Sequence, residues 1–214
     1  MTLQGLFITL EGLDGCGKST QAKMLAESLV SQGHQVALTR EPGGTALAEA
    51  IRNLILTPTA EELDPMAEIL LYAAARAQHV NSLIKPALAA GQIVICERFV
   101  DSSLAYQGYG LGYDLELIRQ VNQTAIGRFE PDLTFLLDID CDQGTRRVLD
   151  RSRDGNQQID RIEARGTTFQ ARVRQGYLAL AQSHPRIQLI QCLHKDIPQV
   201  HAEIRATVAA KLTA

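Results

Sequence analysis

The sequence predicts an α/β protein in which a five-stranded parallel sheet carries helices on both faces. Five apolar runs have the length of a strand, and a helical pattern separates each run from the next. Strands that alternate with helices form parallel sheets, because each crossover helix packs back onto the sheet. The 214 residues contain no linker-like tract and no internal repeat, so we expect a single domain. The predicted strands are Leu6–Leu10, Gln35–Leu38, Gln92–Cys96, Leu133–Leu137 and Ile187–Ile190.

The first strand leads into a phosphate-binding loop. Residues Gly12 to Ser19 read G-x-x-x-x-G-K-S, between a strand pattern and a helix pattern. The glycines let backbone N–H groups turn toward phosphate oxygens, and the following helix adds the positive end of its dipole. The lysine can reach the outer phosphates and the serine hydroxyl can bind Mg²⁺. A tight turn that happens to contain glycines is the alternative. The predicted triphosphate contacts are Gly12, Leu13, Asp14, Gly15, Cys16, Gly17, Lys18, Ser19 and Thr20.

The second strand leads into a loop that combines a basic, an acidic and a rigid residue, Arg40, Glu41 and Pro42. A neutral loop would explain the proline and the two glycines after it, but not the two charges at a strand's carboxyl end. Thr45 can cap the next helix. The apolar positions expected to face the core are Ala22, Leu25, Ala26, Leu29 and Val30 in the helix before this strand, and Leu47, Ile51, Leu54 and Ile55 in the helix after it.

A long helix is predicted to begin with Asp64 as its N-cap and Pro65 as its first residue. Tyr72 and Arg76 are four residues apart and share one face, where a ring beside a guanidinium could stack on a base and hydrogen-bond it. A surface arginine beside a half-buried tyrosine is the alternative. Pro86 is expected to break or kink the helix. Its core face is predicted to comprise Met66, Ile69, Leu70, Ala73 and Ala77.

The third strand ends at Glu97 and Arg98, a carboxylate and an arginine at the mouth of a buried strand. An arginine there could bind an anionic acceptor through two N–H groups at once. Residues 99–108 are rich in hydroxyl and amide groups, and Gly108, Gly110 and Gly112 then predict a flexible turn before a helix capped by Asp114.

Six arginines lie within 20 residues after the fourth strand, around a polar stretch without apolar periodicity. We interpret about 147–162 as a mobile lid that brings arginines onto a transferring phosphate. A solvated, charged helix end is the alternative, since acidic residues are interspersed. These arginines are Arg146, Arg147, Arg151, Arg153, Arg161 and Arg165.

Open parallel sheets bind ligands outside the carboxyl ends of their strands. The polar clusters after the first three strands should therefore meet in one cleft. A P-loop facing an arginine-bearing pocket predicts transfer of the γ-phosphoryl group from a triphosphate to a bound acceptor, chemistry that depends on positioning and charge neutralisation.

Composition and charge argue against several classes of protein. The net charge of -3 argues against a dedicated nucleic-acid binder. The sequence contains no run of 18 apolar residues, so no membrane span is predicted. The N-terminus lacks the layout of a signal peptide. We therefore expect a cytoplasmic location. Four widely spaced cysteines predict neither a disulfide framework nor a metal site.

Several segments together resemble the thymidylate kinase family, nearly from end to end. They are Glu11–Thr20, Thr39–Thr45, Glu97–Phe99, Ala105–Gly108 and Asp160–Glu163. The resemblance implies a P-loop kinase fold and a homodimer that transfers phosphate from ATP to dTMP with Mg²⁺, giving dTDP and ADP for dTTP supply. The remaining alternatives are a kinase for another monophosphate or a deoxynucleoside, and a switch GTPase or motor ATPase. A switch GTPase should carry an N-K-x-D element, which the sequence lacks.

The same resemblance implies roles for single residues. Asp14 would lie near the sugar 3'-hydroxyl and the transferring phosphate, and Arg98 would grip the dTMP phosphate in a pocket also lined by Arg40, Glu41 and Pro42. Tyr72 would stack on thymine, where the family usually has Phe, and Arg76 would bond a thymine carbonyl. Ser103 and Gln107 would meet the base, Tyr106 would crowd the sugar 2' position, and Arg147 would lie near the adenine of ATP.

Two features concern charge at the reaction centre. The P-loop has no basic residue between Gly12 and Gly17, which resembles the bacterial-type arrangement in which lid arginines supply transition-state charge; Arg151 and Arg153 fit that role. Glu97 stands where the family more usually has Asp, and it is expected to reach Mg²⁺ or its water together with Ser19.

Overall fold

The five predicted strands form one parallel sheet in the order β2-β3-β1-β4-β5. The computed structural model describes residues 5–58, 62–153 and 160–213. Each strand extends one or two residues beyond its predicted carboxyl end, so Glu11, Arg40 and Glu97 occupy last strand positions. The strands are β1 Leu6–Glu11, β2 Val36–Arg40, β3 Ile93–Glu97, β4 Leu133–Asp138 and β5 Ile187–Gln191.

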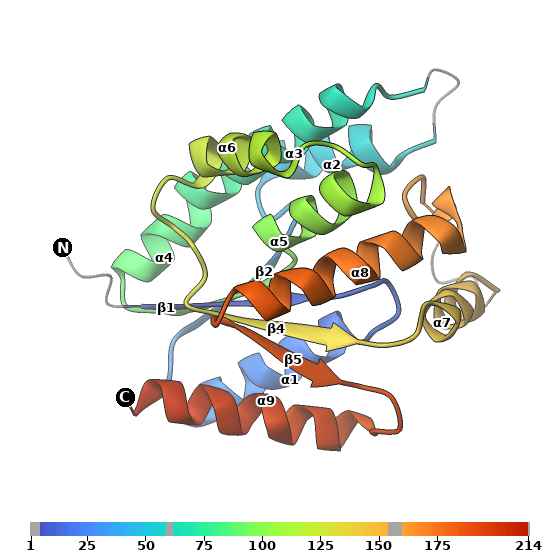
Figure 1. Ribbon diagram of the computed structural model, residues 1–214. Coiled ribbons are helices and arrows are strands. Elements are labelled where there is room, and N and C mark those ends of the chain that lie inside the picture. The colour runs from blue at the N-terminus through green and yellow to red at the C-terminus, as the bar shows by residue number, and fades with distance from the viewer. Residues whose placement is uncertain (1–4, 59–61, 154–159, 214) are drawn as a thin grey trace.

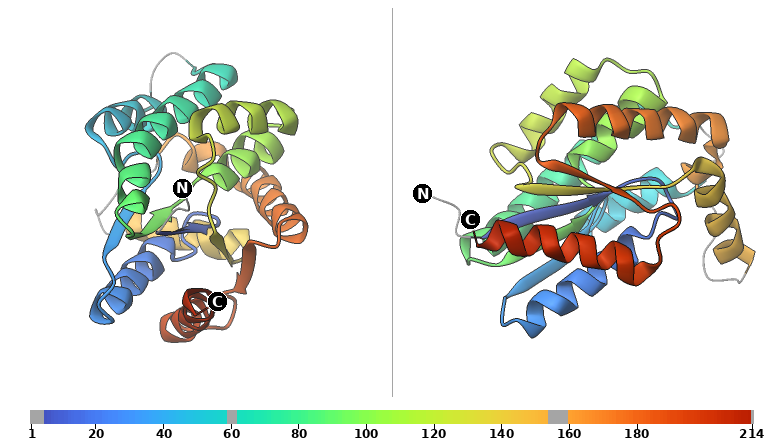
Figure 2. Two further views of the ribbon diagram at one scale, coloured as in Figure 1. Left: turned by 90° about the vertical axis from the view of Figure 1, so that its left-hand side faces the viewer. Right: turned by 60° about the horizontal axis from the view of Figure 1, so that its bottom comes forward.

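Helices cover both faces of the sheet, as predicted. Figures 1 and 2 show α1 and α9 on one face, α3 to α6 and α8 on the other, and α7 beyond the carboxyl end of β4. The α-helices are α1 Lys18–Ser31, α2 Ala46–Leu56, α3 Pro65–His79, α4 Lys85–Ala89, α5 Val100–Ser103, α6 Leu115–Ile126, α7 Cys141–Arg153, α8 Thr167–Ser183 and α9 Ile197–Leu212. None of the helices in the described ranges combines the length and apolar character that a bilayer crossing requires.

The core has two layers because side chains of a strand alternate between faces. On β1, Ile8 and Leu10 pack with Leu25 of α1 and Ile204 of α9. Phe7 points the other way, into a cluster with residues of β3, α4 and α6. The sheet is thus buried on both faces, which leaves its carboxyl edge as the place for polar side chains.

The predicted helix caps are confirmed, whereas some residues predicted to face the core are exposed. Thr45 and Asp64 accept backbone N–H bonds as N-caps of α2 and α3, and Asp114 does the same for α6. The prediction that the apolar positions of α1, α2 and α3 face the core was wrong for four residues, because periodicity does not show which apolar positions a neighbouring element covers. They are Val30, Leu47, Leu54 and Leu70, each more than half exposed.

Two π-helical segments lie where the sequence predicted a flexible turn and a helix break or kink. Leu104–Gly110 is π-helical, so Gly108 and Gly110 do not form the flexible turn that we expected. A Cβ on Gly108 would come within 2.4 Å of Leu115, so close packing rather than flexibility explains this glycine. The segment Val80–Ile84 joins α3 to α4 just before Pro86, where a break or kink was predicted.

Candidate active site

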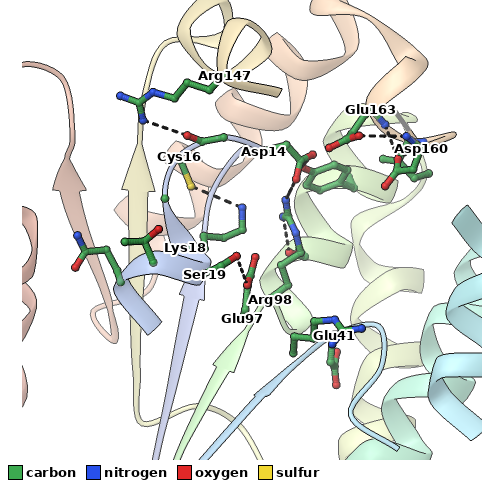
Figure 3. Close-up of a pocket in the computed structure, with 18 of the residues that line it drawn as sticks. Asp14, Cys16, Lys18, Ser19, Glu41, Glu97, Arg98, Arg147, Asp160 and Glu163 are labelled. Atoms are coloured by element: carbon green, nitrogen blue, oxygen red, sulfur yellow. Dashed lines mark hydrogen bonds and ion pairs between the residues drawn. The ribbon is translucent and has the colours of Figure 1, made fainter. Parts of the chain in front are cut away.

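A cavity of about 720 Å³ lies at the carboxyl ends of the strands. Among predicted site residues whose side chains the structure describes, all but Gly12, Leu13 and Arg153 line it. Segments separated by more than 100 residues therefore meet in one cleft, as the topology predicted. Figure 3 shows the labelled side chains of this cavity.

The loop between β1 and α1 has the backbone of a phosphate-binding loop. Gly12 has a φ of 138°, and a Cβ there would come within 2.4 Å of the Leu137 carbonyl, so the position requires glycine. Helix α1 begins at Lys18, whose Nζ donates to the carbonyls of Gly12 (3.2 Å) and Leu13 (2.9 Å). The lysine is thus held over the loop at the positive end of a 14-residue helix.

Two oxygen donors meet beside this loop. The Ser19 hydroxyl donates to Glu97 Oε2 over 2.7 Å, joining the start of α1 to the end of β3 (Figure 3). The described residues contain no cluster of three or more His, Cys, Asp or Glu side chains that could hold a metal. One hydroxyl and one carboxylate suit Mg²⁺, which takes few protein ligands and completes its shell with phosphate and water.

Arg98 connects the P-loop to the end of β3. Its φ of 65° lies in the left-handed region, which is uncommon for a residue with a side chain and recurs at functional sites. Its Nη2 donates to Asp14 Oδ1 (2.6 Å) and its Nη1 to the Gly12 carbonyl (3.0 Å). Burial opposes the charge of Asp14, but Arg98 and Lys18 outweigh it and lower the pKa of that carboxyl to about 2. Tyr106 also bonds both Asp14 and Arg98.

Behind Arg98 lies a buried acid that the sequence analysis did not select. Glu11, which is 1% exposed, accepts bonds from the Ser102 hydroxyl (2.5 Å), the Tyr177 hydroxyl (2.9 Å) and the Phe99 N–H (2.7 Å). Ser102 and Tyr177 in turn accept from Arg98. Burial, and the nearby charge of Asp101, raise the pKa of Glu11 to about 7.

The helix α3 brings Arg76 into the cavity wall rather than onto the surface. Arg76 is 2% exposed, which rules out the surface interpretation for this arginine. Its Nε donates to Glu41 (2.7 Å) and its Nη1 to Ser103 (2.9 Å), and it also bonds Asn122. Tyr72, one helical turn earlier, lines the same cavity.

Helix α2 adds an arginine that was missed. Arg52 lines the cavity, and its Nη1 donates to the Pro42 carbonyl over 3.0 Å. It is the only basic residue of α2, which was the available signal. Arg40 also lines the cavity and pairs with Glu49 at 2.9 Å.

The arginines in and around the predicted lid lie in two places, on α7 and beside Glu68 of α3. Arg147 donates to the Gly15 carbonyl at 3.1 Å (Figure 3), while Arg153 is exposed and pairs with Asp150 at 3.7 Å. Arg161 and Arg165 both pair with the buried Glu68 of α3. The side chain of Arg151 and residues 154–159 lie outside the described part of the chain.

A parallel sheet with a P-loop after β1, facing an arginine at the end of β3, defines a P-loop kinase. Residues 10–204 match the family model for thymidylate kinase. The chain belongs to the thymidylate kinase family, which confirms the resemblance found in the sequence.

Individual relatives agree with this assignment. The chain is 49% identical over 203 residues to a thymidylate kinase of Exiguobacterium sibiricum, covering 94% of this chain and 93% of that one. It is 53% identical over 184 residues to that of Pelotomaculum thermopropionicum, with 86% and 83% covered. A crystal structure of thymidylate kinase from Ehrlichia chaffeensis superposes with a TM-score of 0.76 at 40% identity, covering 96% of this chain and 98% of that one. Thymidylate kinases phosphorylate dTMP to dTDP with ATP as the phosphoryl donor.

Proposed function

We propose that this chain transfers the γ-phosphoryl group of ATP to dTMP in the cavity described above, giving dTDP and ADP. One observation carries the proposal: Lys18 and Arg98 both donate to the Gly12 carbonyl, at 3.2 and 3.0 Å. A lysine suited to a triphosphate and an arginine suited to an anionic acceptor therefore share one backbone oxygen and lie close together. Two cations this close together can hold the phosphate of the donor next to the phosphate of the acceptor, as in-line transfer requires.

On the donor side, the N–H groups of the P-loop and Lys18 would bind the ATP phosphates, and Arg147 would lie beside the adenine. Ser19 and Glu97 would hold Mg²⁺, which supplies neutralising charge on the phosphates when bound. Their 2.7 Å contact supports this assignment, because it places two hard oxygen ligands together beside Lys18.

On the acceptor side, Arg98 would bind the dTMP phosphate and Asp14 the sugar 3'-hydroxyl. The depressed pKa of Asp14 supports its role as an acceptor of a hydroxyl proton in a hydrogen bond, since the group stays ionised at neutral pH. Tyr106 would restrict the sugar 2' position. Tyr72 would stack on thymine, with base edges read by Arg76, Ser103 and Gln107. Arg40, Glu41 and Pro42 would line the same pocket.

A single domain with a lid at about 147–162 remains part of the proposal. Arg151 and Arg153 would reach the transferring phosphate when the lid closes. The exposed position of Arg153 fits a residue that must move, because its ion pair with Asp150 is solvent-exposed and weak.

We also propose a homodimer in the cytoplasm. Leu47 and Leu54 on α2 and Leu70 on α3, two helices that pack together, are each more than half exposed. Exposed large apolar side chains on two helices that pack together favour a protein contact. Free thiols at all four cysteines are consistent with a reducing compartment. Sedimentation of the wild type and of a Leu54→Glu variant tests the dimer, which should dissociate in the variant.

The deciding experiment is a coupled ADP-release assay with dTMP, UMP, CMP and AMP as acceptors. We expect dTMP to be phosphorylated far better than the other three. Equal rates with all four would favour a broad monophosphate kinase instead. Nucleotide-dependent binding of a partner protein without acceptor-dependent turnover would favour a switch protein.

A further inference from the structure

A buried carboxylate lies directly behind the proposed base pocket. Glu68 of α3 is 0% exposed and does not itself line the cavity. It accepts from Arg161 at 2.7 Å and from Arg165 at 2.5 Å, and these bonds to arginine lower its pKa against the effect of burial. Its Oε1 also accepts from Gln107 Nε2 at 3.1 Å. Glu68 is therefore an ionised group that can only accept hydrogen bonds.

The contact with Glu68 decides which way the Gln107 amide points. A carboxylate cannot donate, so the amide nitrogen of Gln107 must face Glu68, and the amide oxygen must face away from it. Gln107 lines the cavity from the π-helical segment Leu104–Gly110. The cavity side of Gln107 is consequently an acceptor and not a donor.

The neighbouring groups have the opposite polarity. Arg76 carries only donors, so the Ser103 oxygen accepts from it at 2.9 Å and the Ser103 hydroxyl keeps its hydrogen to donate elsewhere. The wall thus offers donors at Arg76 and Ser103 beside an acceptor at Gln107. An imide base such as thymine presents a ring N–H next to carbonyl oxygens, whereas cytosine presents an unprotonated ring nitrogen next to an amino group.

We propose that Glu68 is a positioning residue for base specificity: by fixing the amide of Gln107, it makes the pocket accept an imide N–H and reject cytosine. The inference rests on the proposed function, because it requires the base to lie against Gln107. Cytosine would bring its acceptor nitrogen against the Gln107 oxygen, and neither group could be satisfied there.

The test compares dTMP, dUMP and dCMP as acceptors in the wild type and in Glu68→Gln. The pair dUMP and dCMP isolates the imide edge, since neither carries the methyl group. A glutamine at 68 can donate as well as accept, so Gln107 can turn over. We expect the preference for dUMP over dCMP in kcat/KM to fall about tenfold or more, mainly through KM, with the preference for dTMP over dUMP and the KM of ATP unchanged.

Two further variants distinguish a changed orientation of the Gln107 amide from a general loosening of the pocket. Arg165→Lys disturbs the same carboxylate without touching Gln107 and should keep the wild-type preference. The exchange Glu68→Gln with Gln107→Glu lets residue 68 donate to a carboxylate that again presents an acceptor to the base, so the preference should recover. A folded Glu68→Gln enzyme with the wild-type preference would overturn the proposal.

A measurement on the wild type does not depend on folding of the variants. In NMR spectra, the side-chain amide protons of Gln107 should exchange slowly already without dTMP, because the nitrogen donates to the buried Glu68. Fast exchange without dTMP, with protection only when dTMP is bound, would place the nitrogen on the base and overturn the proposal. A wild type that fails to phosphorylate dTMP would contradict the proposed function, whereas a dTMP kinase that keeps its preference in Glu68→Gln contradicts only the role of Glu68.

Discussion

Arg98 and Asp14 form a 2.6 Å ion pair between the end of β3 and the second variable position of the P-loop. The pair is largely shielded from solvent, with side chains 16% and 26% exposed, so its charge interaction is screened less than a surface pair. It joins the segment expected to bind the acceptor phosphate to the loop expected to bind ATP.

Replacing Arg98 by lysine should remove the planar fork while keeping the charge. Arg98 donates from two nitrogens to five acceptors, the Gly12 carbonyl, Asp14, Ser102, Tyr106 and Tyr177, whereas a lysine has three donors on a single nitrogen. We therefore expect kcat/KM for dTMP to fall about 100-fold, with little change in the KM of ATP. Steady-state kinetics at fixed, saturating ATP measure this. Arg119→Lys, at an exposed arginine, is the control, and equal effects of the two substitutions would contradict the assignment.

The contact between Ser19 and Glu97 predicts a specific metal dependence. Glu97→Gln keeps the size of the side chain but loses the negative charge, so the Mg²⁺ concentration for half-maximal activity should rise about tenfold. Titration of activity with Mg²⁺ at constant ATP tests the prediction, with the exposed Glu116→Gln as the control. An unchanged Mg²⁺ requirement would place the metal away from Glu97.

The buried Glu11 predicts a pH dependence of stability. Its pKa is raised from 4.5 to about 7, so the folded protein binds this proton more tightly than the unfolded chain does. The free energy of unfolding should therefore decrease as pH rises from 4.5 to 7, by at most about 1.4 kcal/mol per pH unit from this group, and level off above 7. Asp14 does not interfere, because its stabilising charge is lost only as pH falls from 3.8 toward 2.

Urea unfolding at several pH values between 5 and 8 measures the effect as a difference between the wild type and Glu11→Gln. The variant should lack this part of the slope, while other groups cancel in the difference. Parallel stability curves for the two proteins would show that Glu11 does not titrate in this range.

The close approach of α7 to the P-loop gives a fourth prediction. A Cβ on Gly144 would come within 2.7 Å of the Asp14 carbonyl, which is backbone and cannot turn aside. Gly144→Ala should push α7 away from the loop, raise the KM of ATP several-fold and lower stability by about 1–3 kcal/mol. Kinetics and thermal unfolding test this, with the adjacent Gln143→Ala as the control. If Gly144→Ala kept the wild-type KM of ATP and the wild-type stability, α7 would be able to move away from the loop without cost.

Local patterns were sufficient to predict the fold, because strand length, helix period and the P-loop spacing are all encoded within short segments. The same holds for the caps at Thr45, Asp64 and Asp114. The exposed Leu47 and Leu54 could not be distinguished from core residues, since periodicity identifies an apolar face but not what covers it.

The candidate site was only partly predictable for a related reason. Residues at strand ends could be selected from topology, as with Arg98. The network behind them could not: Glu68 meets Gln107 across 39 positions and Arg165 across 97, and no spacing rule links such residues. The π-helical turn that presents Gln107 has no sequence signature of its own, and its glycines resembled a loop.

The carbonyl that Lys18 and Arg98 share has a consequence for how mutations can affect this enzyme. Every amino acid carries that oxygen, so no substitution at position 12 can delete the group that sets the separation of the two cations. A substitution can only displace it, and Gly12, with its φ of 138°, is where displacement is easiest to cause. The position at which the contacts of Lys18 and Arg98 can be disturbed together is thus a residue without a side chain.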